Sequence, residues 1–277
     1  MSKPYRIARL GWLPDPLDHR DLRVQSATVK TALERTAKFA AKGAIKARAT
    51  TKLPPSVDLS SECTRIENQG EIGSCTAHSV VGLLEYLWKQ TYGKAVDASR
   101  LFVYKATRNL LGWTGDTGAF VRSTIKAVRL FGACPEDYWP YDEPAFDNEP
   151  PAFCYAFAQN FKTIIYYRLE EKVDALRASL AQGVPFAFGF TCFESLFNPD
   201  VEETGVIPFP GPNEAVIGGH AIMAVGYEQA KKRFIIRNSW GRGWGRRGYG
   251  YLPYAYVEQG LADDCWCIVK SQYEGLE

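Results

Sequence analysis

The sequence predicts an α+β fold in which a helical half of the chain is followed by a β-rich half. Apolar residues with helical spacing mark three stretches of the first half: residues 75–92, 100–111 and 119–131. In the second half, short apolar runs indicate strands at residues 221–228 and 233–238. A further buried strand is indicated by alternating aromatic side chains at Phe186, Phe188 and Phe190. The two halves therefore meet near residue 161.

Each predicted element has a local reason. Gly93 and Gly132 follow the first and third helices, where glycine readily ends a helix. A shorter helix at residues 173–180 is ended in the same way by Gly183. The two strand-like runs of the second half are joined by residues 229–232, so they predict an antiparallel hairpin. We expect residues 194–219, which are acidic and rich in turn residues, to form a loop beside the site.

Composition indicates a folded enzyme rather than a disordered adaptor. Apolar residues make up 46% of the chain and aromatic residues 13%, which suffices for a large core. The length of 277 residues fits one domain or two tightly joined ones. There is no apolar signal segment and no run of about 18 apolar residues, so we expect no secretory signal and no membrane span. A cytoplasmic location is the default, and export by an unrecognised route stays open.

Seven cysteines are present, and one of them lies in a reactive setting. Cys75 occupies the first turn of the first predicted helix, where unpaired N–H groups and the helix dipole favour a thiolate. The alternative is a small buried hydrophobic residue. The other six match no zinc pattern, so we expect free thiols, no metal and no cofactor.

Two residues of the hairpin complete a candidate site. His220 begins one strand and Asn238 closes the other, so both lie at the same open end. There the Asn238 oxygen can accept a ring N–H and fix the tautomer of His220. If His220 meets Cys75, the imidazolium stabilises the thiolate. The sequence thus predicts a cysteine peptidase.

Several motifs resemble the papain family of cysteine peptidases, and its bacterial, xylellain-like branch in particular. The motifs are Leu53 to Asp58, Gln69-Gly70 followed by Gly73-Ser74-Cys75, and the Asn238 to Gly245 segment. The resemblance implies two lobes, a helical left lobe at residues 53–161 and a β-rich, barrel-like right lobe at residues 162–277, with the active-site cleft between them. It also implies the roles of four residues: Gln69 as oxyanion-hole amide, Cys75 as nucleophile, His220 as acid and base, and Asn238 as orienter.

The resemblance further implies substrate contacts along the cleft, at Thr117, Gly118, Gly219 and Trp240. Trp240 is expected to shield the hydrogen bond between Asn238 and His220. The chain departs from the family at three positions: Ile72 replaces a cysteine, Thr76 a tryptophan and His78 a phenylalanine. His78 lies one turn beyond Cys75, and we expect it to be a packing residue rather than the base.

Residues 1–52 form a basic leader before the predicted peptidase domain at residues 53–277. The leader carries a net charge of +8 and the remainder −6. Residues 5–25 resemble an extended strap, and residues 27–48 have good helix propensity. We expect the leader to lie on the acidic body, partly across the cleft, as a prosegment held largely by charge. A solvated tail is the alternative; nucleic-acid binding is disfavoured because no aromatic residues interleave the basic ones.

The predicted function is hydrolysis of peptide bonds in a peptide or protein substrate through an acyl-enzyme. Two alternatives use the same fold. One is an acyl-transfer or deamidating enzyme with the same triad, and the other is a catalytically silent binding protein. No oligomeric state is predicted.

Overall fold

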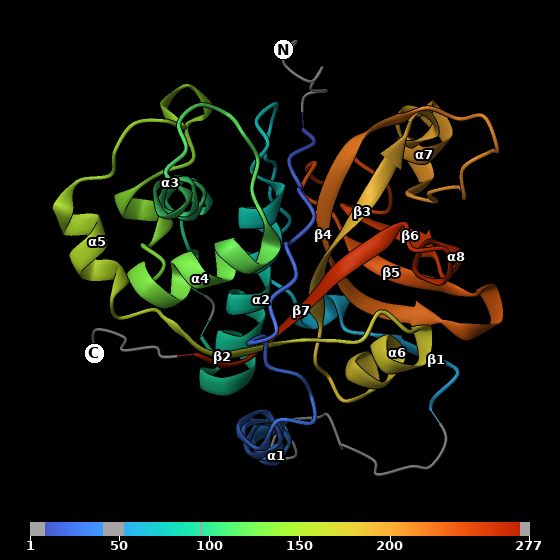
Figure 1. Ribbon diagram of the computed structural model, residues 1–277, viewed down its shortest axis with the longest axis horizontal. Helices are drawn as coiled ribbons and strands as arrows, with labels where there is room; N and C mark the ends of the chain where they lie inside the picture. Colours follow the sequence, from blue (N-terminus) through green and yellow to red (C-terminus); the bar gives the residue numbers. More distant parts are fainter. Residues whose placement is uncertain (1–8, 41–52, 95, 272–277) are drawn as a thin grey trace.

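The computed structural model of the chain describes residues 9–40, 53–94 and 96–271. Helices gather on one side and strands on the other, and a segment of the leader runs between them (Figure 1). One continuous core of buried side chains joins both sides and includes Leu10 and Trp12 of the leader. The predicted α+β fold with two lobes is confirmed.

The helical side is built around α2 (Cys75–Tyr92), which starts and ends where the sequence predicted. Every residue from Cys75 to Trp88 is buried. The sequence indicated one apolar face only, but strand β4 packs against α2 while α3 and α4 cover it elsewhere. The other helices of this side are α3 (Arg100–Leu111), α4 (Val121–Phe131) and α5 (Ala152–Ala158).

An ion pair buried at α2 needs explanation because a charge in a protein interior is costly unless it is paired. Glu85 of α2 is 1% exposed, and Arg100 at the start of α3 is 3% exposed. Two nitrogen–oxygen distances of 2.9 Å join the guanidinium to both carboxylate oxygens. One guanidinium nitrogen, Nη2, donates to both oxygens, so the pair compensates both buried charges and fixes α3 against α2.

The strands of the described residues form one antiparallel sheet in the order β2-β7-β3-β4-β5-β6, and β1 pairs with β4. Their bounds are β1 (Ser56–Asp58), β2 (Thr163–Arg168), β3 (Phe186–Phe193), β4 (Val216–Glu228), β5 (Arg233–Arg237), β6 (Tyr249–Pro253) and β7 (Ala262–Ser271). The predicted hairpin is confirmed as β4 and β5. However, β4 begins at Val216, so His220 lies inside the strand rather than at its start.

The segment expected to be a loop, residues 194–219, is more regular than predicted. It contains a 3-10 turn (Glu194–Phe197), helix α7 (Pro199–Thr204) and the first residues of β4. Asn198 precedes Pro199 at the first position of α7, where proline costs no hydrogen bond. Two further short helices border the sheet: α6 (Val173–Ala181) and α8 (Ala255–Glu258).

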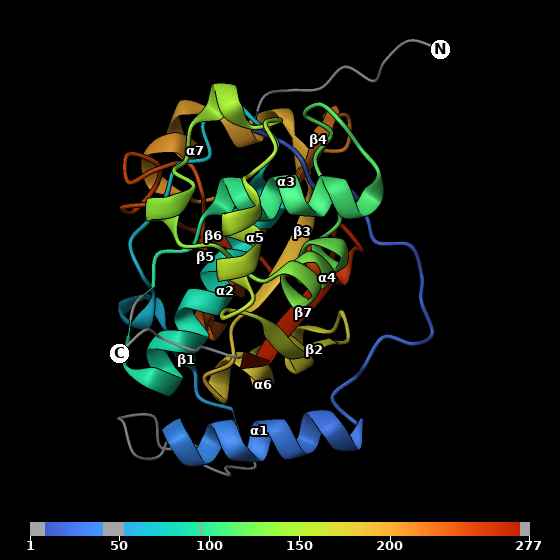
Figure 2. The ribbon, with the colours of Figure 1, turned by 90° about the vertical axis from the view of Figure 1, so that its left-hand side faces the viewer.

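The leader contributes helix α1 (Ala27–Ala40), which lies beneath the rest of the molecule in Figure 2. It contacts α2, β2 and β7, and its Val29 and Ala32 side chains are buried. The part of the predicted helix beyond residue 40 lies outside the described residues. Within the described ranges, none of the helices combines the length and apolarity needed to cross a bilayer.

Candidate active site

Cys75 is the first residue of α2 and is completely buried. Gly73, two residues earlier, donates its backbone N–H to the Asp116 carboxylate at 2.9 Å. This bond ties the loop before α2 to the neighbouring wall of the helical side. The backbone N–H groups of the first turn of α2 lie around the thiol, where they favour its anionic form.

His220 and Asn238 are joined across the hairpin. The ring nitrogen Nε2 of His220 lies 2.8 Å from Oδ1 of Asn238, which accepts its hydrogen. Because Nε2 is engaged in this way, Nδ1 is the ring nitrogen left for proton exchange with a thiol. The Trp240 indole stacks on the imidazole with ring centroids 4.7 Å apart, so it covers this hydrogen bond.

Cys192 of β3 locates the thiol relative to this pair. Burial raises the pKa of Cys192 well above its usual value, the nearby charge of Cys75 raises it further, and a bond from the backbone of His220 opposes both. Cys192 therefore lies near both Cys75 of α2 and His220 of β4, so these two predicted residues belong to the same region of the structure.

Gln69 is held from several directions. Its backbone N–H donates to the carbonyl of Ser239 at 2.8 Å, and its side-chain oxygen accepts the Ser239 hydroxyl hydrogen at 2.6 Å. Its amide nitrogen donates to the carbonyl of Ile72 at 2.8 Å. Tyr141 donates to the Gln69 carbonyl at 2.8 Å. Because Ser239 directly follows Asn238, one chain of contacts links Gln69 to the predicted catalytic pair.

These four side chains come from two sides of the molecule: Gln69 and Cys75 precede or begin α2, whereas His220 lies in β4 and Asn238 follows β5. A sequence profile described as papain family cysteine protease matches residues 53–269. An uncharacterized peptidase C1-like protein of Acanthamoeba polyphaga mimivirus is 37% identical over 212 residues, covering 73% of this chain and 68% of that protein. Cathepsin K of Gallus gallus is 32% identical over 212 residues, covering 73% of this chain and 60% of the relative. The chain belongs to the papain family of cysteine proteases.

A crystal structure of xylellain, a cysteine protease from Xylella fastidiosa, superimposes with a TM-score of 0.82 at 32% identity. This match covers 99% of the present chain and all of the other, so it includes the leader, whereas the profile begins at residue 53. The resemblance predicted from the motifs is confirmed, and the protein is a cysteine endopeptidase by class. It spans 68% and 60% of the lengths of the mimivirus protein and cathepsin K.

In this papain-family structure the leader occupies the space beside the site. We call residues 9–13 the strap. The amide nitrogen of Gln69 donates to the carbonyl oxygen of Arg9 at 3.0 Å. Farther along, Trp12 donates to the carbonyl of Gly219 at 3.0 Å, and the strap pairs with Ala119 through two bonds of 2.8 and 3.1 Å. The strap therefore contacts both walls of the cleft at once.

Glycines allow this close approach. A Cβ added to Gly118 would lie 2.8 Å from the carbonyl carbon of Gly11, and one added to Gly219 would lie 2.6 Å from the Trp12 ring. Gly118 also has a φ of +72°, which L side chains rarely adopt. Thr117, in contrast, is exposed, and its hydroxyl donates to the Gly118 carbonyl at 3.0 Å. Of the expected wall residues, Gly118 and Gly219 are those that meet the strap.

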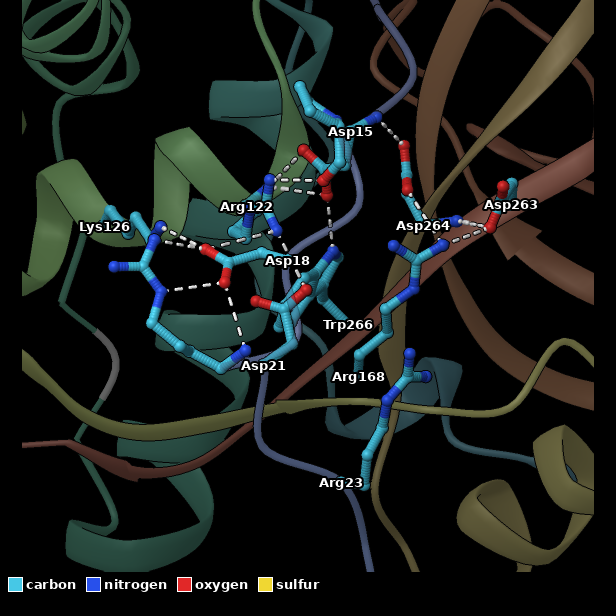
Figure 3. Close-up of polar contacts among 12 residues, drawn as sticks. Asp15, Asp18, Asp21, Arg23, Arg122, Lys126, Arg168, Asp263, Asp264 and Trp266 are labelled. Atoms are coloured by element: carbon cyan, nitrogen blue, oxygen red, sulfur yellow. Dashed lines mark hydrogen bonds and ion pairs between the residues drawn. The ribbon is translucent and has the colours of Figure 1, made fainter.

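The leader and the body are joined by ion pairs between acidic leader residues and basic body residues, whereas the sequence predicted basic leader residues on an acidic body. Asp21 pairs with Arg122 of α4 at 2.9 Å, and Asp18 lies 3.9 Å from both Arg122 and Lys126 (Figure 3). Acidic leader residues thus meet basic residues of the body in this region. Only the exposed pair of Arg9 with Glu71 has the expected polarity among the described contacts of the strap. Six basic residues of the leader lie outside the described residues, so their expected contact with the acidic body stays a prediction: Lys3, Arg6, Lys42, Lys46, Arg48 and Lys52.

Three titratable groups lie near the strap: the half-buried Asp15 and the buried Asp264 and His220. Burial raises the pKa of Asp15 to about 6, although a hydrogen bond from Trp266 and the charge of Arg122 act against it. Burial and the nearby Asp15 raise the pKa of Asp264 to about 7. Burial lowers the pKa of His220 to about 4, opposed by its bond to Asn238. With the strap in place the neutral imidazole is therefore favoured, whereas the predicted imidazolium requires access to the thiolate or to water.

Several residues that support the site were not predicted. Asp116, Tyr141 and Ser239 fix the loops around Cys75 and Gln69, and Asp264 binds the strap. Ser239 lies inside the Asn238 to Gly245 segment, and Asp116 directly precedes the expected contact residue Thr117, so the sequence indicated the regions of both. Asp264 lies in β7, far along the chain, and nothing in the sequence around it indicated a contact with the leader. The prediction that His78 packs is confirmed, since it is buried and its ring lies 3.1 Å from the Ser74 carbonyl.

Proposed function

We propose that the chain is a latent cysteine peptidase in which Cys75 is the nucleophile, His220 the proton carrier, Asn238 its orienter and Gln69 the oxyanion donor. Contact between the lobes supports this assignment, because Gln69 is linked through Ser239 to the hydrogen-bonded pair of Asn238 and His220. In this proposal an N–H donor, a base and a thiol act on one substrate carbonyl.

In the proposed reaction, His220 takes the proton of Cys75, and the sulfur attacks the carbonyl carbon of a peptide bond. The carbonyl oxygen becomes an oxyanion that the amide nitrogen of Gln69 and the backbone N–H of Cys75 stabilise. His220 gives its proton to the leaving amine, and an acyl-enzyme remains. His220 then deprotonates a water molecule, which attacks the acyl-enzyme and releases the acid with recovery of the thiol.

One observation supports latency: the carbonyl oxygen of Arg9 already accepts the hydrogen that an oxyanion would need from Gln69. A peptide carbonyl cannot occupy the same place. The strap must therefore leave before an extended peptide or protein substrate can bind between Gly118 and Gly219. The leader is the intramolecular partner of this site.

The test uses the full chain. A thiol-directed peptidyl reagent should label Cys75 slowly in the native chain and faster in a variant whose strap is displaced, and that variant should hydrolyse reporter peptide amides. Cys75→Ser should abolish both signals. A chain that is never labelled would be a silent binding protein, and a product that forms only with an added amine would indicate acyl transfer. Equal labelling with and without a docked strap would exclude latency.

A further inference from the structure

A small cavity lies between α2 and the hairpin of β4 and β5, next to the proposed orienting residue Asn238. Apolar side chains of β4 form part of its lining. The polar part of the lining includes Glu67, His78, Arg100, Arg237 and Asn238. The cavity has room for one water-sized molecule. It therefore joins the two lobes at a point that adjoins the proposed catalytic pair.

His78 brings an unpaired acceptor to this cavity. The side chain is 6% exposed, and its ring nitrogen Nδ1 donates to the carbonyl oxygen of Ser74 at 3.1 Å. Burial lowers the pKa of His78 well below its usual value, and the charges of Arg100 and Arg237 lower it further, so the ring is neutral. Because Nδ1 carries the hydrogen, Nε2 has a free lone pair. Within the described residues, Nε2 has no hydrogen-bond partner.

Arg237 brings unused donors from the β-rich lobe. Its guanidinium is buried, and within the described residues its hydrogen bonds go from Nη2 to Thr64 and to the carbonyl of Arg65. Nη1 lies over Gly82, where an added Cβ would be 2.6 Å from it. Gly82 lies one helical turn beyond His78, so the two positions are neighbours on α2. A glycine inside a helix costs about 1 kcal/mol relative to alanine, and here it makes room for the guanidinium.

Asn238 brings a further donor on the side of the site. Its Oδ1 accepts hydrogen bonds from Nε2 of His220 and from the backbone N–H of Ser239, each at 2.8 Å. Within the described residues, all side-chain hydrogen bonds of Asn238 use this oxygen. Its amide nitrogen Nδ2 is therefore left for the cavity, which Asn238 also lines. A buried N–H group without an acceptor costs about 1–3 kcal/mol, so a ligand that accepts is favoured.

The charges and hydrogen-bonding groups of the lining indicate the kind of ligand. A cation is disfavoured because the guanidinium groups of Arg100 and Arg237 both line the cavity. An anion is disfavoured by the lone pair of His78 and by the carboxylate of Glu67. A water molecule can accept hydrogen bonds from Asn238 and Arg237 while it donates to Nε2 of His78. About three such bonds are typical of a buried water.

We propose that the cavity is a binding site for one water molecule, which links His78 to Asn238 and makes His78 a positioning residue of the active site. The water holds the amide group of Asn238 through Nδ2, so that Oδ1 stays directed at Nε2 of His220. A phenylalanine, which the papain family has in place of His78, offers no acceptor for this water. The inference rests on the proposed function, because it concerns the orientation of the same catalytic pair.

The experiment compares two substitutions of His78 in the full chain carrying Gly11→Ala, a change in the strap that is expected to displace it. His78→Phe keeps a flat ring and removes the acceptor, whereas His78→Gln can place an amide oxygen near the position of Nε2. With reporter peptide amides, His78→Phe should lower kcat about 3- to 10-fold, the range for one lost hydrogen bond, and leave KM little changed. His78→Gln should keep most of the activity. A side chain that serves packing alone would give the opposite order, because phenylalanine fills an apolar space better than glutamine.

The matched control is His19→Phe, the same substitution at an exposed position of the leader, which should change neither kcat nor KM. Urea unfolding reports whether each variant keeps its fold. A crystal structure of the full native chain should show a water within hydrogen-bond distance of both Nε2 of His78 and Nδ2 of Asn238, and crystals of His78→Phe should lack it.

The inference is overturned if this water is absent from the native crystal, or if His78→Phe lowers kcat no more than His78→Gln does. The crystal decides the matter even where a variant fails to fold. Absence of both labelling and hydrolysis in the Gly11→Ala chain with His78 intact would instead overturn the proposed function.

Discussion

Replacing Gly11 by alanine tests whether the strap closes the site. A Cβ at this position would lie 2.6 Å from both the Cα and the carbonyl carbon of Gly73, and closer still to its oxygen. Gly73 cannot easily yield, because its N–H is bonded to Asp116 and it lies two residues before Cys75. The strap must therefore move, and it loses backbone bonds to Gly219 and Ala119 as it does so.

The size of the effect follows from the overlap. Forcing a methyl group into a packed contact costs about 1–3 kcal/mol, and this cost falls only on the form with the strap docked. A shift of 1–3 kcal/mol raises the population of the open form about 5- to 150-fold. We expect the rate of Cys75 labelling in Gly11→Ala to rise by a factor in this range, up to the rate of the open chain.

The assay compares labelling rates of the native chain, Gly11→Ala and Gly211→Ala at one pH. Gly211 is the control because a Cβ there meets no atom within 4 Å, so the same substitution should leave labelling unchanged. Far-ultraviolet circular dichroism and the unfolding midpoint report whether the fold is kept. If Gly11→Ala keeps its fold and labels no faster than Gly211→Ala, the strap does not close the site and the argument for latency fails.

Three further predictions concern the site, the leader and the core. Asn238→Ala removes the acceptor that orients His220 and should lower kcat at least about 10-fold, with KM little changed, in a chain with the strap displaced. The pKa of Asp15 is raised to about 6, so its contribution to docking is present below its ordinary pKa of 3.8 and is lost as pH rises through 6. As pH rises from 3.8 to about 6, the ratio of the Cys75 labelling rate in the native chain to that in Gly11→Ala should therefore increase. This increase should be absent in Asp15→Asn. Glu85→Gln removes the charge of Glu85 and leaves the buried Arg100 with the partly exposed Asp97 as an ionic partner. It should lower the free energy of unfolding by about 3 kcal/mol, measured in urea; an effect below about 1 kcal/mol would contradict the assigned burial.

Much of the fold could be predicted because the sequence marks it locally. The bounds of α2 agree with its apolar spacing and with Gly93, and β4 and β5 agree with two apolar runs and their connection. The start of β4 was wrong by four residues, since Val216 to Gly219 are paired with β3 although they lack the apolar alternation of a strand. Pairing with β3, which is distant in sequence, decided the conformation of residues 216–219, and their intrinsic strand propensity could not indicate this pairing.

Hydrogen bonds connect Gln69, through Ser239, to the pair of Asn238 and His220, but the sequence could not show what else lies beside them. Gln69, His220 and Asn238 belong to motifs with recognisable spacing. The contact of Trp12 with Asp264 joins residues 252 positions apart, and nothing in either local segment indicates it. The acidic contacts of the leader were missed for a related reason: net charge averages over a segment, whereas Asp15, Asp18 and Asp21 lie around Arg122.

The same surfaces must serve the strap and a substrate, and this sets the balance between latency and activity. The strap uses Gln69, Gly118 and Gly219, so a peptide can bind only when these contacts are vacant. Helix α1 is docked separately, which tethers the strap and gives it an effective concentration of about millimolar or higher. A free peptide with the same intrinsic affinity therefore competes poorly at micromolar concentration. Weak individual contacts therefore suffice for latency as long as the chain between the strap and α1 is intact. Cutting the chain there should be enough to remove latency.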